Sequence, residues 1–253
     1  MATVDLNCDM GESFGAYSIG ADAEVMPYIT SANIACGFHG GDPSVMRETV
    51  RLAMEHGVAV GAHPGLPDLV GFGRRTMDVS AQDAYDMIVY QLGAMMATAA
   101  ALGARVAHVK AHGALYNMAA AKAPLADAIA RAVHDVDESL VLFGLAGSHI
   151  IAAGEKLGLR TASEVFADRN YMPDGSLVPR SRPDAMVESA EVAVRRAVEM
   201  VQRGRVTSVE GQELSLRADT ICLHGDGAHA GDFARALRAG LEAAGVTVRA
   251  ATL

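Results

Sequence analysis

The sequence predicts an α/β fold, namely a single-domain, TIM-like (β/α) barrel with about seven parallel strands over residues 1–253. Short strand-like runs alternate with longer helical patterns almost to the end of the chain, as parallel strands joined by helical crossovers require. The 253 residues, 51% of them hydrophobic, suffice for one large core. Unusual polar residues directly follow the strand-like runs, which is typical of barrels whose active sites lie at the strand ends.

The expected strands are short apolar runs, and no linker, repeat or low-complexity segment separates them into domains. In chain order they are Thr3–Cys8, Ala32–Cys36, Val58–Ala62, Val106–Val109, Leu140–Leu145, Arg160–Ser163 and Thr220–Leu223, with a final short run at Val246–Arg249. A count of about seven strand–helix units at this length favours a closed or nearly closed barrel over an open sheet.

Capping signals mark the helices between these strands. Asp42 and Pro43 form an N-cap followed by proline at the first helical position, and Gly57 ends that helix. A second helix, rich in Ala and Met, begins at Ser80 and ends near Gly103. Both helices are long enough to cross back over a parallel sheet.

The last third of the chain has a different pattern. The segment Arg182–Asp184 precedes an amphipathic stretch that continues to about Gln202, so we expect a helix there. Residues Arg205–Leu216, with Gly211 at their middle, predict an inserted β-hairpin.

Composition and charge exclude several classes of protein. The net charge of −9 argues against binding to nucleic acid. Three cysteines without a CxxC pair argue against a disulfide framework and a zinc ribbon. The first residues lack a basic leader, and no apolar run approaches the ~20 residues of a membrane span. We expect a cytoplasmic protein that does not contact membranes.

Six polar motifs follow the expected strands. Because the carboxyl ends of parallel strands share one face, the motifs should meet in one site. They are Asn7–Gly15, Cys36–Asp42, Ala62–Arg75, Val109–Asn117, Glu164–Tyr171 and His224–His229.

Strand periodicity predicts which side chains face the barrel interior. Side chains two apart share a face, so Asp5, Asn7 and Asp9 point one way and the apolar residues between them the other. Lys110 lies between His108 and His112 on one face in the same manner. We expect the polar phase to face inward and the apolar phase, which includes Cys8 and Cys36, to pack against helices. Asp5, at the start of its strand, should be structural.

Nine histidines are present, and a lone histidine is more often structural than functional. His56 and His134 are expected at the surface, and His149 at the rim or inert. The remaining motif histidines share one rim, so we expect most of them to be functional; these are His39, His63, His112 and His224.

The motifs leave the cofactor question open. Asp9, His39 and His63 can supply metal ligands, and His224 and Asp226 are further candidates, but no HExxH or similar spacing occurs. A divalent metal is therefore possible without being established. A GxxxxGK[ST] phosphate loop is absent from the sequence.

The ordered set DLNCDMGESFG, NIACGFHGGD, GAHPGLPDLVGFGRR, VKAHGALYN, EVFADRNY and CLHGD resembles the LamB/YcsF family of ATP-hydrolysing 5-oxoprolinase A subunits. The resemblance spans residue 5 to about residue 226, and Ala111 stands where proline is common. It implies a barrel akin to the glycoside hydrolase/deacetylase folds. It also implies the conversion of 5-oxo-L-proline, ATP and water to L-glutamate, ADP and phosphate, with ATP handled together with two partner subunits, B and C.

This chemistry suggests roles for the motif residues. A base must activate water, and cations must stabilise the developing oxyanion. Asp9, Glu12 and His63 are alternative bases, Lys110 and His112 suit the oxyanion or phosphate, and an arginine suits the substrate carboxylate. The catalytic candidates are Asp9, Glu12, His39, His63, Lys110 and His112. The substrate-binding candidates are Asn7, Arg74, Arg75, Asn117, Asp168, Arg169, His224 and Asp226. Two alternatives stay open, a metal-dependent deacetylase or amidohydrolase and a non-catalytic substrate-binding subunit.

Overall fold

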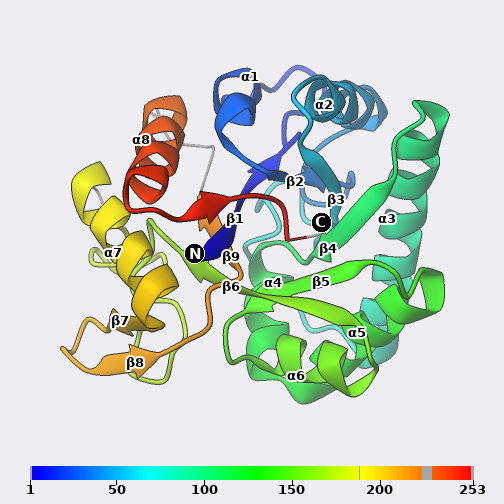
Figure 1. Ribbon diagram of the computed structural model, residues 1–253. Helices are drawn as coiled ribbons and strands as arrows, with labels where there is room; N and C mark the ends of the chain where they lie inside the picture. Colours follow the sequence, from blue (N-terminus) through cyan, green and yellow to red (C-terminus); the bar gives the residue numbers. More distant parts are fainter. Residues whose placement is uncertain (1, 188, 224–229, 252–253) are drawn as a thin grey trace.

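Seven parallel strands form a closed barrel in the computed structural model, which describes residues 2–187, 189–223 and 230–251 (Figure 1). The last barrel strand pairs with both the sixth and the first strand, which closes the ring. A short strand, β10 (Thr247–Val248), adds to the start of the first. The barrel strands are β1 (Thr3–Met10), β2 (Ser31–Ala35), β3 (Ala59–His63), β4 (Val106–Lys110), β5 (Val141–Leu145), β6 (Arg160–Phe166) and β9 (Thr220–Leu223). The expected seven-stranded parallel barrel is confirmed.

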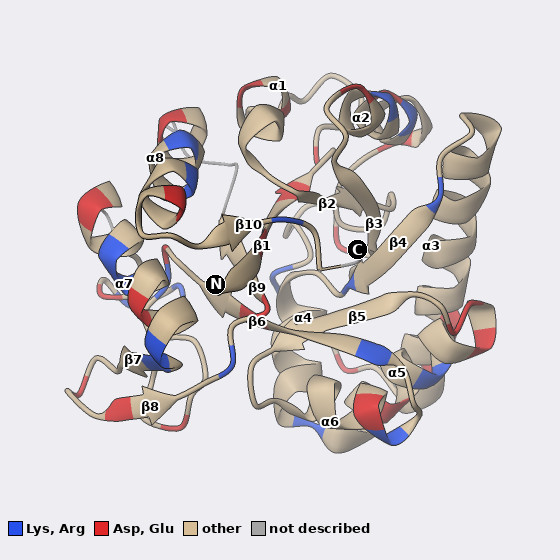
Figure 2. Cartoon of the chain, viewed as in Figure 1, with Lys and Arg blue, Asp and Glu red and all other residues tan. Residues whose placement is uncertain are grey.

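Helices cover the outside of the barrel (Figure 1). Figure 2 shows that Lys, Arg, Asp and Glu lie mostly on these helices and the loops around the barrel. No helix of the described residues is both long and apolar enough to cross a membrane. The helices are α1 (Asp22–Val25), the 3₁₀ turn η1 (Met26–Tyr28), α2 (Pro43–Glu55), α3 (Ala81–Ala101), α4 (Gly113–Ala121), α5 (Ala123–Val136), α6 (His149–Lys156), α7 (Ala190–Arg203) and α8 (Ala230–Ala243).

The capping signals place α2 and α3 correctly. The Asp42 carboxylate accepts hydrogen bonds from the first-turn amides of Ser44 and Val45, each at 2.9 Å. Ser80 and Asp83 form a reciprocal capping box at the start of α3. Both contacts satisfy amide groups that have no partner within the helix.

The last third of the chain is partly different from the expectation. The strands β7 (Arg205–Thr207) and β8 (Glu213–Ser215) form the expected antiparallel hairpin. The helix expected after Arg182–Asp184 is α7, which begins only at Ala190, where the Ser189 hydroxyl accepts from the amide of Val192. Residues 182–185 instead form a turn, closed by a backbone hydrogen bond of 3.2 Å from Ala185 N to Arg182 O.

The two faces of β1 confirm the expected inward orientation of the polar side chains. Leu6 and Cys8 belong to the apolar layer between barrel and helices, and both are fully buried. Asn7, between them, points into the barrel and donates to Thr220 of the neighbouring strand β9 at 2.7 Å. Asp5 is also buried and accepts hydrogen bonds from hydroxyl groups, including that of Ser31 at 2.7 Å. Its role is therefore structural, as predicted.

Gly61 in β3 makes room for a buried histidine of the neighbouring strand. A Cβ at this position would lie 2.0 Å from His108 Nε2. The His108 ring stacks on Phe143 with centroids 4.3 Å apart, and Phe143 packs with Val141 and Ala162 as an apolar layer inside the barrel. The interior thus combines an apolar layer around Phe143 with buried polar groups at both the amino and the carboxyl ends of the strands.

Candidate functional site

A cavity of about 650 Å³ opens at the carboxyl ends of the barrel strands. Its inner end is lined by Asp9 of β1, His63 of β3, Lys110 of β4 and His112 just after β4. Its walls are helix α4, the loop before α6 and the loop that follows β6. Four of the six expected strand-end motifs therefore line one concave site, and the sixth, His224–His229, lies outside the described residues. The volume is within the range of ~300–1,000 Å³ common for small-molecule pockets.

One side of the inner end is built around a buried ammonium group. Lys110 Nζ lies 2.8 Å from Glu164 Oε1, 3.0 Å from Asp9 Oδ1, 3.2 Å from Asn7 Oδ1 and 3.1 Å from Cys222 Sγ. Burial alone would lower the pKa of Lys110, but the charges of Asp9 and Glu164 among its neighbours raise the pKa well above its ordinary value. We call these five residues the lysine cluster. Its lysine stays positively charged.

Glu164 is a member of this cluster that the sequence interpretation missed. Its side chain is fully buried, and besides Lys110 it accepts a hydrogen bond of 2.6 Å from the hydroxyl group of Tyr116. Burial, and then the negative charge of Glu164, raise the pKa of Tyr116 well above its ordinary value. The available signal was an acidic residue that shares the inward phase of the strand with Ala162 and Phe166.

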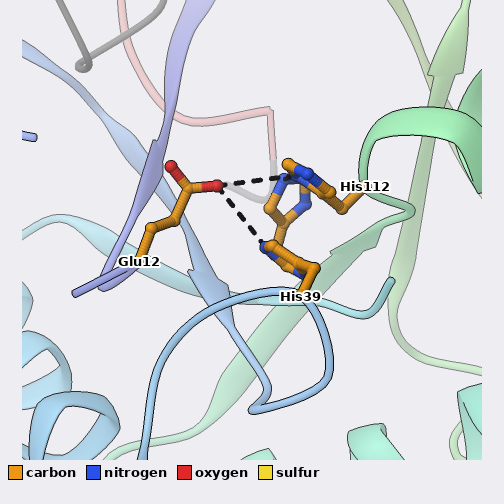
Figure 3. A group of neighbouring side chains, drawn as sticks. Glu12, His39 and His112 are labelled. Atoms are coloured by element: carbon orange, nitrogen blue, oxygen red, sulfur yellow. Dashed lines mark hydrogen bonds and ion pairs between the residues drawn. The ribbon is translucent and has the colours of Figure 1, made fainter. Parts of the chain in front are cut away.

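The other side holds Glu12, His39, His63 and His112, which we call the histidine cluster. One nitrogen or oxygen atom from each lies within 4.8 Å of the others. Glu12 Oε1 is 3.4 Å from His39 Nε2 and 3.5 Å from His112 Nδ1, and the rings of His39 and His112 stack with centroids 3.6 Å apart (Figure 3). His63 Nε2 lies 3.0 Å from His112 Nδ1 and 3.2 Å from Asp9 Oδ2, so it connects the two clusters.

Burial keeps the stacked rings neutral. It lowers the pKa of His39 well below its ordinary value, and neighbouring His112 and His63 lower it further. Burial likewise lowers the pKa of His112, with His63 adding to the effect. Histidines that are neutral near pH 7 offer lone pairs to a proton or a metal ion.

The turn that carries His39 depends on its neighbours for space and position. A Cβ at Gly65, in the loop after β3, would lie 2.5 Å from His39 Nδ1. Asp42 caps α2 and also accepts a hydrogen bond of 2.9 Å from the amide of Gly15, which ties the first and second motifs together. His39 is thereby held against the barrel mouth, and Asp42 has a structural role.

Cationic groups surround the outer part of the cavity. Arg74, Arg169 and Arg180 line it, together with Asn117. Arg169 is held by a hydrogen bond of 2.6 Å to the carbonyl oxygen of Val178, and burial, followed by the nearby charge of Arg180, lowers its pKa to about 10. The cavity thus has an acidic and imidazole-rich inner end and a guanidinium-rich outer part.

Other sequence-predicted residues lie elsewhere. Arg75 pairs with Asp68, and neither belongs to the described lining of the cavity. Asn7 lies below the cavity as a partner of Lys110, and Asp168 is buried next to Arg169. His224 and Asp226 lie outside the described residues. Cys8 and Cys36 are buried in the apolar core as expected, and His149 is at the cavity wall.

Comparisons with known proteins agree with this arrangement. The model of the LamB/YcsF family matches residues 4–253. The 5-oxoprolinase A subunit of Tolumonas auensis is 64% identical over 250 residues, which cover 99% of this chain and 100% of that protein. The crystal structure of a lactam utilization protein from Thermus thermophilus aligns with a TM-score of 0.92 at 50% identity, covering 98% of this chain and 99% of that chain. A polysaccharide deacetylase from Bacillus cereus, at 9% identity and a TM-score of 0.53, covers 99% of this chain and 92% of its own and shares the fold alone.

Proposed function

The chain belongs to the LamB/YcsF family, and we propose that it is the A subunit of an ATP-dependent 5-oxoprolinase, which opens 5-oxo-L-proline to L-glutamate. One observation carries this conclusion, the 64% identity to a 5-oxoprolinase A subunit over the whole length of both chains. The fold likeness to a deacetylase does not favour a second function, because the identity there is 9%.

The reaction requires activation of a poor electrophile. A five-membered lactam is a resonance-stabilised amide, and phosphorylation of its carbonyl oxygen by ATP makes the carbonyl carbon susceptible to water. The sequence has no phosphate loop of the GxxxxGK[ST] type. We therefore assign the handling of ATP to the complex formed with the B and C subunits, and the binding and opening of the lactam to the cavity of this chain.

The lysine cluster suits the electrophilic half of this chemistry. Lys110 lines the cavity, and Asp9 and Glu164 keep its ammonium group charged and fixed in position. A preorganised positive charge at the point where an oxygen becomes negative is worth most in a site from which water is excluded. We assign Lys110 to the lactam oxygen or to the phosphoryl group attached to it.

Asp9 is the best placed of the three candidate bases. Its carboxylate lines the cavity and lies between Lys110 and His63. Asn33 donates to Asp9 Oδ1 at 2.9 Å and so fixes the orientation of the carboxylate. Glu12 belongs to the histidine cluster without lining the cavity among the described residues. We assign Asp9 to the removal of a proton from the attacking water.

The arginines suit the anionic parts of the substrate. Arg74 and Arg169 face the cavity from different loops, and a guanidinium group can bind a carboxylate through two parallel hydrogen bonds. Because the lactam is small relative to about 650 Å³, the same cavity also has room for a phosphoryl group on the lactam oxygen.

The test is an assay of glutamate and phosphate formation from 5-oxoproline and ATP. We expect turnover when this chain is combined with the B and C subunits, and none of useful rate with the chain alone, since acid–base groups contribute only ~10²–10⁴-fold. Equal glutamate formation by the isolated chain would contradict the division of labour. Absence of glutamate formation in the complete complex would contradict the function.

A further inference from the structure

Two backbone carbonyl groups fix the hydrogen positions on two rings of the histidine cluster. His63 Nδ1 lies 2.7 Å from the carbonyl oxygen of Lys110, and His112 Nε2 lies 2.8 Å from that of Phe72. A carbonyl oxygen can only accept a hydrogen bond, so each of these nitrogens carries the hydrogen of its ring. The remaining nitrogens, His63 Nε2 and His112 Nδ1, therefore present lone pairs.

These two lone pairs face each other and two carboxylates. His63 Nε2 and His112 Nδ1 are 3.0 Å apart, a distance at which two acceptors without a shared hydrogen repel. Asp9 Oδ2 lies 3.2 Å from the first nitrogen, and Glu12 Oε1 lies 3.5 Å from the second. Ligand atoms of His63, His112 and Glu12 thus lie around one point, within 4.8 Å of one another, and a positively charged group between them would turn the repulsion into attraction.

His39 adds a third imidazole to the same point. Its side chain is fully buried, and neither ring nitrogen makes a hydrogen bond within the described part of the chain. Its Nε2 lies 3.4 Å from Glu12 Oε1, the same oxygen that faces His112 (Figure 3). Buried polar atoms nearly always have a partner, so a ring without a hydrogen bond in this position indicates a ligand.

We propose that the histidine cluster binds one divalent transition-metal ion, with His63 Nε2, His112 Nδ1 and Glu12 Oε1 as ligands and His39 within reach as the fourth. Bonds of ~2.0–2.1 Å in a tetrahedral zinc site place neighbouring ligand atoms about 3.4 Å apart. The separations His63–His112 of 3.0 Å, His112–Glu12 of 3.5 Å and His39–Glu12 of 3.4 Å are close to that value. The role of the ion in turnover rests on the proposed function, but its binding does not.

The donor set selects the class of metal. Imidazole nitrogens favour zinc and similar transition metals, whereas Mg²⁺ and Ca²⁺ prefer oxygen ligands. Histidine ligands commonly donate their second N–H to a carbonyl or carboxylate group, as His63 and His112 do here. When bound, such an ion supplies a Lewis acid for water beside Asp9 at the inner end of the cavity.

The experiment measures Zn²⁺ binding to the purified, untagged chain by titration calorimetry after treatment with EDTA and dialysis, with Mg²⁺ as the comparison. Two substitutions each remove one ligand atom and keep a donor for the backbone carbonyl group that the histidine contacts. His63→Asn retains a donor to the Lys110 carbonyl group, and His112→Gln retains one to the Phe72 carbonyl group. His108→Gln is the matched control, because His108 is equally buried and lies on the same strand as Lys110, but outside the cluster.

We expect the wild type and His108→Gln to bind one equivalent of Zn²⁺, with weaker binding of Mg²⁺. His63→Asn and His112→Gln should each raise the Kd for Zn²⁺ at least about tenfold. If one of these variants does not fold, Glu12→Gln, which keeps the shape of the side chain, should show the same loss.

Absence of stoichiometric Zn²⁺ binding by the wild type would overturn the proposal, as would equal affinities in all variants. Measuring glutamate formation by the complete complex separates failure of the metal site from failure of the proposed function. Glutamate formation by a chain that binds no Zn²⁺ refutes the metal site alone. Zn²⁺ binding by a chain whose complex forms no glutamate refutes the function alone.

Discussion

Lys110 and His112 are two positions apart in the sequence and line the same cavity, yet their surroundings shift their pKa values in opposite directions. Asp9 and Glu164 surround Lys110 and raise its pKa. Burial lowers the pKa of His112, and the neighbouring His63 lowers it further. The inner end of the site therefore keeps a fixed positive charge on one side and neutral lone pairs on the other. An electrophilic group and a ligand set can thus coexist within one small site.

The largest effect is expected from removal of the positive charge on the lysine side. Lys110→Met should lower glutamate formation by the reconstituted complex by at least ~10²–10³-fold, the loss typical of an oxyanion contact. It should also destabilise the fold by about 3–5 kcal/mol, because Glu164 stays buried without its cation. Urea unfolding checks the second effect.

The double variant Lys110→Met/Glu164→Gln separates these effects. It should recover much of the stability because the buried negative charge is gone, and it should stay inactive. Recovery of activity together with stability would show that Lys110 serves the fold alone.

Asp9→Asn tests the carboxylate that borders both clusters. We expect activity to fall by ~10²–10⁴-fold, with a nearly unchanged melting temperature, because asparagine fills the same volume. Asp5→Asn is the matched control on the same strand. Asp5 is more deeply placed and accepts from hydroxyl groups of Thr30 and Ser31, so its substitution should lower stability more than that of Asp9. An Asp9→Asn protein with full activity would contradict the assignment of Asp9.

A smaller effect, on the KM for 5-oxoproline, is expected from an arginine in the outer part of the cavity but not from its neighbour in the chain. Arg74 lines the cavity, whereas Arg75 is paired with Asp68. Arg74→Met should raise the KM for 5-oxoproline about 10–100-fold, as loss of a charged hydrogen bond of ~1.5–3 kcal/mol implies. Arg75→Met should leave the KM almost unchanged. Equal effects of the two substitutions on KM would show that the arginine contacts have been assigned incorrectly.

The smallest effect concerns pH and a buried histidine outside both clusters. Burial, and then Lys110, lower the pKa of His108 to about 3, against about 6.5 in an unfolded chain. Between these values the unfolded chain binds a proton that the folded chain does not, so His108 makes stability fall as pH falls below about 6.5. His108→Gln should reduce the pH slope of the unfolding free energy between roughly pH 5.5 and 4.5 by about 1 kcal/mol per pH unit. An unchanged slope in urea unfolding would indicate that His108 is already protonated in the folded protein.

The sequence was most informative where local rules decide the structure. Alternation in β1 predicted the inward face of Asn7, and the caps at Asp42 and Ser80 predicted the starts of α2 and α3. The first residue of α7 was not specified by the sequence, because Arg182–Asp184 belong to a separate turn and the helix is capped by Ser189.

Contacts between distant segments were not predictable in the same way. Glu164 pairs with Lys110 and Tyr116 across the barrel, and this pairing depends on strand registers that the sequence does not specify. Arg74 and Arg75 are adjacent in the chain, but Arg75 pairs with Asp68 in the folded loop and Arg74 lines the cavity. The sequence could therefore predict which motifs meet, but not which members of each motif contact one another.

The most direct test of the account is a crystal structure of the chain with 5-oxoproline bound. We expect the lactam to be opened between the lysine and histidine clusters. We expect the lactam oxygen within hydrogen-bond distance of Lys110 Nζ, the lactam carbonyl carbon beside the space next to Asp9, and the substrate carboxylate against Arg74 or Arg169. A lactam bound outside this cavity, or bound with its carboxylate on Lys110 and its ring oxygen directed to the outer arginines, would contradict the claim.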